Sequence, residues 1–334
     1  MIPTKVAPRM PSLPPLPDIE AEALKDKTPA QSLDYLRLHL RDDTRAGAKR
    51  LLSKFEKAVQ REGKEKERME SLWKHEREAR EKGFLRVAGV DEAGRGPLAG
   101  PVVAAAAILP LEGLPAGIND SKKLTPAKRD ELFEKIREKA LAVGVGQASV
   151  AEIDELNIYR AAQLAMERAI GALGEKPDFL LTDAMPLPAL KAIPQKPLVH
   201  GDALSLSIAA ASIIAKVTRD RMMGELHRQY PVYGFEGHKG YGTEEHMRAL
   251  ETHGPCPEHR LSFGPVMETL AKKSPGGPLG YWKGRLEMSK NPAELHQVGV
   301  QIKRVAMGHL AEPDLKILRD LFRTKRSQWP NEKA

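Results

Sequence analysis

The chain has 334 residues, enough for one large domain or two smaller ones, and its 41% hydrophobic and 29% charged residues form an ordinary soluble profile. Its formal net charge of +8 favours an anionic partner, either nucleic acid or a membrane surface, although many soluble proteins are equally basic. No run of about 18 or more apolar residues occurs, which excludes a membrane-spanning helix.

Cysteine content and the first residues indicate the compartment. Cys256 is the only cysteine, so an intramolecular disulfide is excluded, and this suits a reducing environment. The segment that begins at Met1 has no apolar stretch long enough for a signal peptide. We therefore expect a cytoplasmic protein without membrane association.

The first part of the chain divides into two regions. Residues 1–29, with many prolines near the start, predict a disordered leader. Residues 30–83 are dense in Lys, Arg and Glu and carry leucines at partial helical spacing, so they predict a charged helical extension. The stretch 61–82 is either a solvated helix or a helix that grips DNA.

Residues 84–272 predict the folded centre of the protein. Five apolar runs predict strands: Leu85–Val90, Pro101–Leu109, Leu141–Val150, Asp178–Thr182 and Leu198–Val199. Four stretches predict helices: Thr125–Ala140, Ile158–Leu173, Leu204–Tyr230 and Thr243–His253. Strands come early and helices late, which favours an α/β sheet followed by a helical C-terminal portion.

A Pro- and Gly-rich break at Ser274–Pro278 separates this centre from the last part of the chain. Residues 273–334 predict a basic tail that carries no recognisable motif, with a helix at Leu315–Phe322. The tail is either an arm that binds a partner or a flexible appendage.

Acidic residues follow several of the expected strands. Asp91 and Glu92 come directly after an apolar strand and precede a Gly-rich turn. Neighbouring carboxylates repel each other unless a cation neutralises them, and Mg²⁺ and Mn²⁺ prefer oxygen ligands. Asp183 ends a further strand, and Asp202 stands before the long helix, where it is alternatively an N-cap. Carboxylates at several strand ends predict a metal site.

Other polar residues have simpler interpretations. The histidines at 238, 246, 253 and 259 and Cys256 fit no standard zinc spacing. Asp220, on the long helix, is interpreted as a partner for a basic residue. Asp154 and Glu155 are interpreted as the solvated start of a helix.

Four segments resemble the motifs of ribonuclease HII, the type 2 ribonuclease H family of bacteria. They are Gly89–Pro101, Ile118–Leu124, Ser207–Asp220 and His238–Thr243, and their order and spacing are similar to those of the family over residues 84–268. The resemblance implies a ribonuclease H-like mixed sheet flanked by helices. It also implies an endonuclease that cuts the RNA strand of RNA–DNA hybrids and nicks 5′ of ribonucleotides embedded in duplex DNA, giving 5′-phosphate and 3′-OH ends.

The resemblance assigns roles to individual residues. Asp91, Glu92, Asp183 and Asp202 match the catalytic carboxylates, which bind two divalent ions, Mn²⁺ or Mg²⁺. The other matches contact substrate: Gly94, Arg95 and Gly96 form the turn that senses the ribose 2′-OH, Tyr241 stacks on the sugar of the next deoxynucleotide, and Asn119, Ser121 and Lys122 contact phosphates. The implied partners are RNA–DNA hybrid and ribonucleotide-containing duplex DNA, and we expect a monomer.

The sequence departs from the family at His200, where many bacterial members have Lys, and the change alters local charge without removing a carboxylate. The turn Gly94–Gly96 favours ribonuclease HII over ribonuclease HIII, which typically has Lys at the position of Arg95. Two alternative classes remain open. A non-catalytic nucleic-acid binder would be expected to lose a carboxylate, whereas a transposase or integrase core would lack the Gly-Arg-Gly turn and Tyr241.

Overall fold

The computed structural model describes residues 14–305 and 310–329. Clustering of contacts divides the chain after Ser71 into two compact units. In the described residues no helix is both long and apolar enough to cross a bilayer.

The first unit consists of helices that share an apolar core. Helix α1 (Leu16–Leu24) and helix α2 (Pro29–His39) pack with α3 (Ala46–Leu72), and a capping box at Thr28 starts α2. The buried side chains include Ile19, Leu36 and Phe55. The prediction of a disordered leader over residues 1–29 is therefore wrong for its second half, because the apolar face of α1 finds a partner; residues 1–13 lie outside the described residues.

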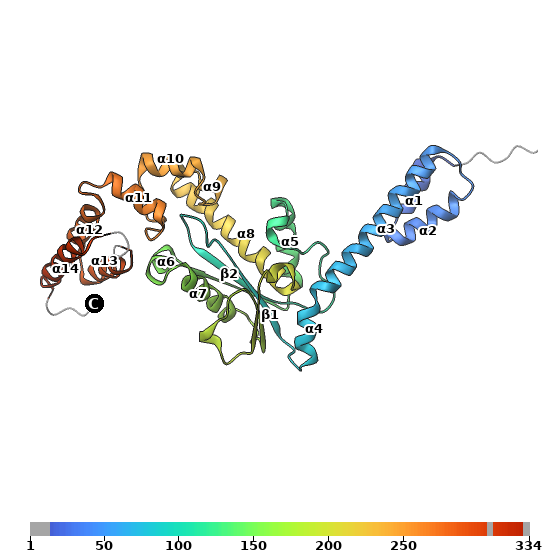
Figure 1. Cartoon of the computed structure of the whole chain (residues 1–334). Helices are drawn as coiled ribbons and strands as arrows, with labels where there is room; N and C mark the ends of the chain where they lie inside the picture. Colours follow the sequence, from blue (N-terminus) through green and yellow to red (C-terminus); the bar gives the residue numbers. More distant parts are fainter. Residues whose placement is uncertain (1–13, 306–309, 330–334) are drawn as a thin grey trace, which may run out of the picture. The chain divides into compact units, whose positions relative to one another are not determined.

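The second unit is built on a mixed five-stranded sheet of order β3-β2-β1-β4-β5 (Figure 1). The strands are β1 (Val87–Ala93), β2 (Val102–Ile108), β3 (Ala142–Ala148), β4 (Phe179–Asp183) and β5 (Gln195–Leu198). Strands β1, β2 and β3 pair antiparallel, whereas β4 and β5 continue the sheet parallel to β1. The five expected strands are confirmed, with shifts of a few residues at their ends.

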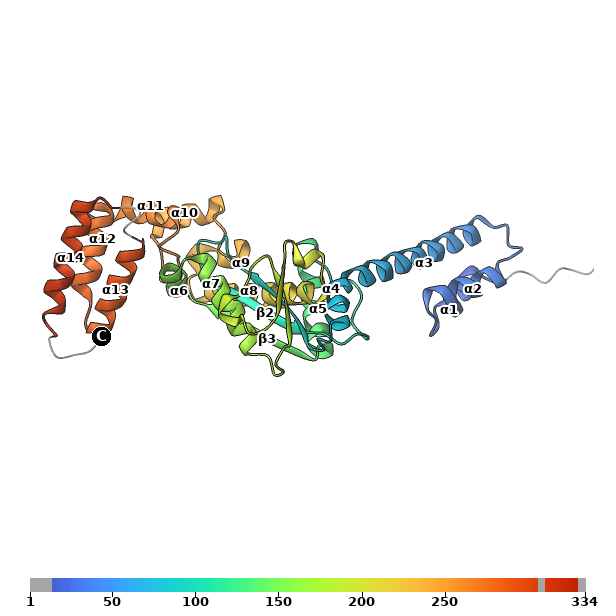
Figure 2. The same cartoon turned by 60° about the horizontal axis from the view of Figure 1, so that its bottom comes forward.

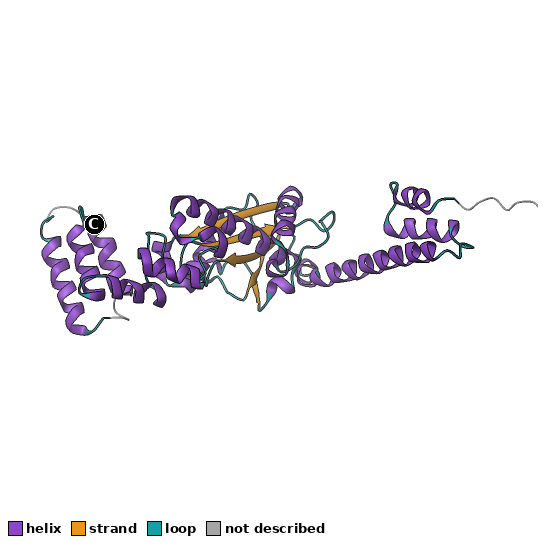
Figure 3. Ribbon diagram, turned by 90° about the horizontal axis from the view of Figure 1, so that it is seen from above, coloured by secondary structure: helices purple, strands orange, loops and turns teal. Residues whose placement is uncertain are grey.

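Helices cover both faces of this sheet, so the strands lie between helices (Figure 3). Alternate residues of β1 point to opposite faces. Ala88 and Val90 pack with α7 (Ile158–Gly171), whereas Val87 packs with Ile208 of α8 (Leu206–Gln229). A Cβ at Gly89 would lie 2.1 Å from the backbone carbon of Ser207. Only glycine allows α8 to approach β1 this closely.

Helix α4 (Lys74–Glu81) belongs to this second unit. Glu76 is 1% exposed, and its Oε1 accepts hydrogen bonds from the hydroxyls of Ser205 and Ser207, both at 2.6 Å. It also accepts from Ser207 N at 2.9 Å, which places an anion at the positive N-terminus of α8. This buried carboxylate joins α4 to the start of α8, and the boundary expected at residue 83 stays a prediction.

Helices also fill the C-terminal region. After α5 (Pro126–Lys139) and α6 (Val150–Leu156), the later elements are α9 (Phe235–His238), α10 (Glu244–His253), α11 (Gly264–Lys273), α12 (Gly277–Met288), α13 (Pro292–Val305) and α14 (Glu312–Arg326). Figure 2 shows α12, α13 and α14 side by side. Trp282 and Leu286 of α12 share one apolar cluster with Phe235 and Leu250. The helix expected at Leu315–Phe322 is confirmed within α14, whereas the boundary at 272 and the role of the tail stay predictions.

Candidate active site

Three strand ends carry the candidate carboxylates to one edge of the sheet. Asp91 and Glu92 are the fifth and sixth residues of β1, and Asp183 is the last residue of β4. Asp202 lies in a 3-10 turn, Gly201–Ala203, that follows β5. Because β1, β4 and β5 run parallel, their C-terminal ends meet at the same edge.

Most of the expected site residues line one cavity of about 320 Å³. Its walls include Asp91, Glu92, Asp183, Gly94, Arg95, Gly96, Ser121, Lys122 and Tyr241. Asp202 and Asn119 do not line it. Asp202 lies beside it, with its Oδ2 3.9 Å from Lys122 Nζ, whereas the Oδ1 of Asn119 accepts a hydrogen bond from Asp120 N at 2.9 Å.

The carboxylates crowd one another in a poorly hydrated place. Burial, and then the charges of Glu92 and Asp183, raise the pKa of Asp91 well above its ordinary value. Burial also raises the pKa of Glu92, which the Arg95 guanidinium partly opposes from 3.3 Å. Burial, Asp120 and Asp183 raise the pKa of Asp202. Ionisation of these carboxylates is therefore unfavourable in the free protein, and a bound cation would favour it.

The donor set suits a hard divalent cation. All four candidates are carboxylates, and Glu92 Oε2 is buried without a hydrogen-bond partner among the described residues. In the part of the chain that the structure describes, no three His, Cys, Asp or Glu side chains surround a single point as a finished ligand set. Three of the four carboxylates line the cavity and Asp202 lies beside it, so these are the residues that would hold a divalent ion together with its waters.

Left-handed backbone supports the loops that carry these acids. Ala184, directly after Asp183, has φ 54°, and His200, two residues before Asp202, has φ 58°. Residues with side chains rarely adopt this conformation, and it concentrates at functional sites. Gly201 N donates to Asp183 Oδ1 at 2.8 Å, so the two loops are joined. His200 is exposed, and the effect of having His here stays a prediction.

Two buried arginines, which the sequence analysis missed, organise the backbone around the pocket. Arg219 donates to the carbonyls of Ala99, Pro101 and Lys239 at 3.0–3.1 Å. Arg260 donates to the carbonyls of Gly94, Arg95 and Gly100. Burial lowers the pKa of Arg219 to about 10 and that of Arg260 to about 9, so both remain charged at neutral pH. The available signal for Arg219 was a charged residue near the middle of α8, shortly after its Ala- and Ile-rich first half.

Three further polar side chains have defined partners in the second unit. Ser212 lines the cavity and donates to Ser121 Oγ at 2.8 Å. Lys216 also lines it and donates to Asp220 at 2.7 Å, which confirms Asp220 as the partner of a basic residue. Asp154 was wrongly interpreted as solvated: it is 4% exposed and accepts from Leu261 N and Ser262 N, because it caps the segment after Arg260.

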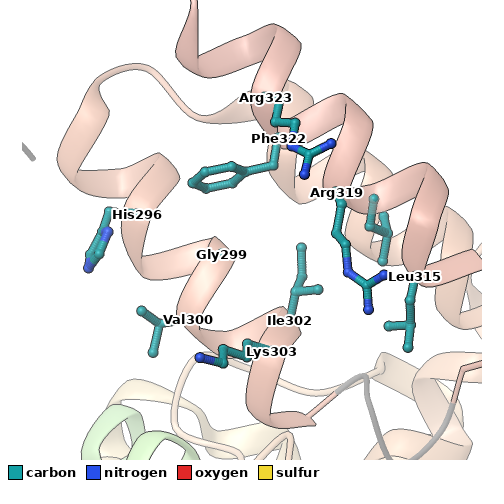
Figure 4. Close-up of a pocket in the computed structure, with 10 residues that line it drawn as sticks. His296, Gly299, Val300, Ile302, Lys303, Leu315, Arg319, Phe322 and Arg323 are labelled. Carbon is teal, nitrogen blue, oxygen red and sulfur yellow. The ribbon is translucent and has the colours of Figure 1, made fainter. Parts of the chain in front are cut away.

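A second cavity lies between α13 and α14 and measures about 710 Å³ (Figure 4). Phe322 of α14 points toward Gly299 of α13, where a Cβ would lie 2.5 Å from its ring. The walls are mainly apolar and contain no carboxylate. None of the residues that line this cavity lines the acidic pocket.

The sheet order and the acidic pocket at its edge define an α/β enzyme of the ribonuclease H-like class. Residues 88–266 match the family model for ribonuclease HII, and residues 20–80 match the model for the ribonuclease HII N-terminal domain. The chain belongs to the ribonuclease HII family. It is therefore a hydrolytic endonuclease that acts on phosphodiester bonds of RNA in RNA–DNA hybrids and depends on a divalent metal ion.

Curated relatives agree with this assignment. A ribonuclease HII of Geobacillus thermodenitrificans is 56% identical over 235 residues, which are 70% of this chain and 90% of the relative. A ribonuclease HII of Bacillus anthracis is 51% identical over 253 residues, covering 76% of this chain and 97% of the relative. The described α14 lies beyond the residues that the family models match.

Among solved structures, the ribonuclease H2 of Pyrococcus horikoshii is 28% identical with a TM-score of 0.48, over 55% of this chain and 97% of that one. A ribonuclease HII of Archaeoglobus fulgidus, solved in complex with PCNA, is 28% identical with a TM-score of 0.46, over 53% of this chain and 94% of that one.

Proposed function

We propose that this enzyme nicks duplex DNA on the 5′ side of an embedded ribonucleotide and cuts the RNA strand of hybrids with the same carboxylates. The observation that carries the proposal is one pocket lined by Asp91, Glu92 and Asp183 together with the Gly94–Gly96 turn and Tyr241. The pocket combines a hydrolytic centre with a close backbone turn and an aromatic ring, which are the parts needed to cut at a ribose and to recognise it.

We assign Asp91, Glu92, Asp183 and Asp202 to the binding of two divalent ions. When bound, such ions lower the pKa of a water nucleophile and stabilise the leaving 3′ oxygen. The chain's own part is to hold these carboxylates at the strand ends, with Asp91 and Asp202 only 4% and 6% exposed. Arg95 donates to Glu92 Oε1 at 3.3 Å, while Glu92 Oε2 is buried and has no hydrogen-bond partner among the described residues.

Substrate positioning falls to the groups around these acids. The side chain of Lys122 is 82% exposed beside Asp202, where it can contact a phosphate without leaving the pocket edge. Tyr241 is 46% exposed, and a Cβ at Gly96 would lie 3.5 Å from its ring. The turn and the ring therefore form one continuous surface, suited to a ribose followed by a deoxynucleotide. We keep Ser121 as a phosphate contact of that surface and place Asn119 beside it.

The sequence left open a non-catalytic binder of RNA–DNA hybrids, and membership of a family of endonucleases sets this alternative aside. All four carboxylates are present and three line the pocket, which favours the enzyme. The expectations of a cytoplasmic location and a monomeric state stay predictions.

The test is cleavage of a DNA duplex with one embedded ribonucleotide, beside an all-DNA duplex and a uniform RNA–DNA hybrid, each with Mg²⁺ or Mn²⁺. We expect a single cut 5′ of the ribonucleotide that leaves a 3′-OH, and no cut in DNA alone. Cutting of the hybrid but not of the single-ribonucleotide duplex would reject junction recognition. Inertness on all three with either metal would reject the enzyme.

A further inference from the structure

The surface that we assign to the ribonucleotide junction has two parts, the Gly94–Gly96 turn and Tyr241. The buried segment His259–Arg260 lies between them. His259 is 1% exposed and Arg260 0%. The backbone of the segment pairs with Leu98–Gly100, directly after the Gly-Arg-Gly turn: Arg260 N donates to Leu98 O at 2.9 Å, and Gly100 N donates to Glu258 O at 2.8 Å. The segment is thus fixed to the chain that leaves the turn.

The side chain of Arg260 reaches the turn itself. Its Nη2 donates to Gly94 O at 2.6 Å and its Nη1 to Arg95 O at 2.9 Å, while Nη2 and Nε both donate to Gly100 O. Within the described residues all four bonds go to backbone carbonyls and none to a carboxylate. A buried charge without an ion-pair partner is costly, so we look for its role in what it positions. The planar guanidinium thus holds the first two residues of the turn at a fixed distance from Gly100, which follows the turn.

The neighbouring His259 reaches Tyr241 through a second histidine. Cys256 N donates to His259 Nδ1 at 3.0 Å, so the proton of His259 is on Nε2 and faces His246 Nε2 at 3.0 Å. His246 accepts there, and its Nδ1 donates to Tyr241 O at 2.9 Å. Every donor and acceptor in this series of hydrogen bonds has a partner when both imidazoles are neutral. Burial lowers the pKa of each imidazole, which favours the neutral form.

Surrounding groups reinforce this arrangement. The ring of His238 stacks on that of His246 with centroids 4.5 Å apart, and its Nε2 donates to Tyr233 O at 2.7 Å. Arg219 donates to Lys239 O at 3.0 Å, two residues before Tyr241. Buried polar groups thus hold the backbone of the loop that carries Tyr241, while the Tyr241 side chain is half-exposed.

We propose that His259 and Arg260 act together as positioning residues for the junction, Arg260 fixing the Gly94–Gly96 turn and His259 fixing Tyr241 through His246. Their adjacency in the chain sets the distance between the part of the surface that reads the ribose and the part that stacks on the next sugar. The inference rests on the proposed function, because a fixed distance matters only if both parts read one junction.

The test measures junction preference, defined as kcat/KM on the single-ribonucleotide duplex divided by kcat/KM on a uniform hybrid. Arg260→Lys keeps the charge and loses the fork, and His246→Leu removes the donor to Tyr241 O. We expect each to lower the preference by roughly tenfold or more. His246→Asn, whose Nδ2 can replace the imidazole Nδ1 as donor, is expected to recover most of it. His253→Gln, on the same helix but exposed, is the matched control and should change nothing.

A double-mutant cycle covers the case in which Arg260→Lys does not fold, which thermal unfolding would reveal. In a Tyr241→Ala background, His246→Leu should lower the preference by less than about threefold further, because its route to substrate is already removed. Equal losses on both substrates, or independent effects of His246 and Tyr241, would overturn the inference while leaving the proposed function intact. Failure of the wild-type enzyme to cut the single-ribonucleotide duplex would instead reject the proposed function, and this inference with it.

Discussion

At the scale of single residues, the acidic pocket places like charges where water is scarce. Asp91 is 4% exposed, and its pKa is raised by burial and by Glu92 and Asp183. An ionised Asp91 therefore opposes folding of the metal-free protein, which is a common consequence of building a catalytic centre. A bound cation reverses the sign of this interaction.

Asp91→Asn separates catalysis from stability. We expect cleavage to fall by about 10²-fold or more, because a metal ligand is lost. In the absence of metal, the variant should unfold at a temperature equal to or higher than that of wild type, since the repulsion is relieved. Thermal unfolding with and without Mn²⁺, together with direct titration of Mn²⁺, measures both effects. Glu155→Gln, an exposed carboxylate of the same unit, is the control; unchanged Mn²⁺ affinity in Asp91→Asn would remove Asp91 from the site.

The buried imidazole of His259 gives a pH dependence of stability. Burial lowers its pKa to about 3, whereas the unfolded chain has the ordinary value of 6.5. Between these values the unfolded state binds a proton that the folded state does not, so stability is full above about 6.5 and is lost as pH falls toward 3. His259→Gln lacks this proton. The stability advantage of wild type over the variant should therefore shrink by up to about 1.4 kcal/mol per pH unit on acidification.

Urea unfolding of wild type and His259→Gln at several pH values from about 4 to 8 checks this slope. Other titrating groups near the site, including His246, His238, Cys256 and Glu258, are present in both proteins, so the difference isolates His259 to first order. A difference that stays constant with pH would mean that His259 is solvated or already protonated in the folded state.

At the scale of elements, the position of the site depends on how closely α8 approaches β1. Gly89 lies two residues before Asp91, and a Cβ there would meet the backbone at Ser207 and Ile208 at 2.1–2.3 Å. Neither neighbour is a flexible side-chain end, so the helix or the strand would have to move. A shift of β1 displaces Asp91 and Glu92 directly.

Gly89→Ala should therefore destabilise the second unit by about 3 kcal/mol or more and reduce cleavage in whatever fraction folds. Gly224→Ala is the matched control, because Gly224 lies within α8 and a Cβ there would meet nothing within 4 Å. That control should stabilise by about 0.5–1 kcal/mol through helix propensity alone. Chemical denaturation measures the change in the free energy of unfolding for each variant. Equal changes in the two variants would show that β1 and α8 do not pack as closely as described.

The elements show how much a single sequence can predict. The five strands and the helix over Leu206–Gln229 were expected because their apolar runs are bounded by turn residues. The carboxylates were expected because each follows a strand. Arg260 was not, because its partners Gly94 and Arg95 lie about 165 residues away and no local pattern encodes that contact. Helices α1 and α12 were missed because their Pro- and Gly-rich starts, at Pro15 and Gly276, resemble leader and linker sequence.

At the scale of the whole second unit, the C-terminal helices share a core with the catalytic elements. Trp282 is fully buried in one cluster with Phe235 and Leu250, which belong to the elements that flank the loop bearing Tyr241. The family model ends at residue 266, so this chain extends its core with residues that the model does not match. We therefore predict that the extension contributes to the stability of the catalytic unit.

Trp282→Ala tests this dependence. Loss of a fully buried indole is expected to cost about 3–5 kcal/mol, and because the cluster is continuous the whole second unit should unfold in one earlier transition. Cleavage should fall with temperature in step with that transition, since Phe235 and Leu250 lose a packing partner. Ile317→Ala, at a 42% exposed position of α14, should change neither the unfolding transition nor the cleavage. If unfolding of Trp282→Ala instead occurs in two steps, with α12–α14 melting first and cleavage persisting after that step, the extension is an appendage, and the catalytic core is complete without it.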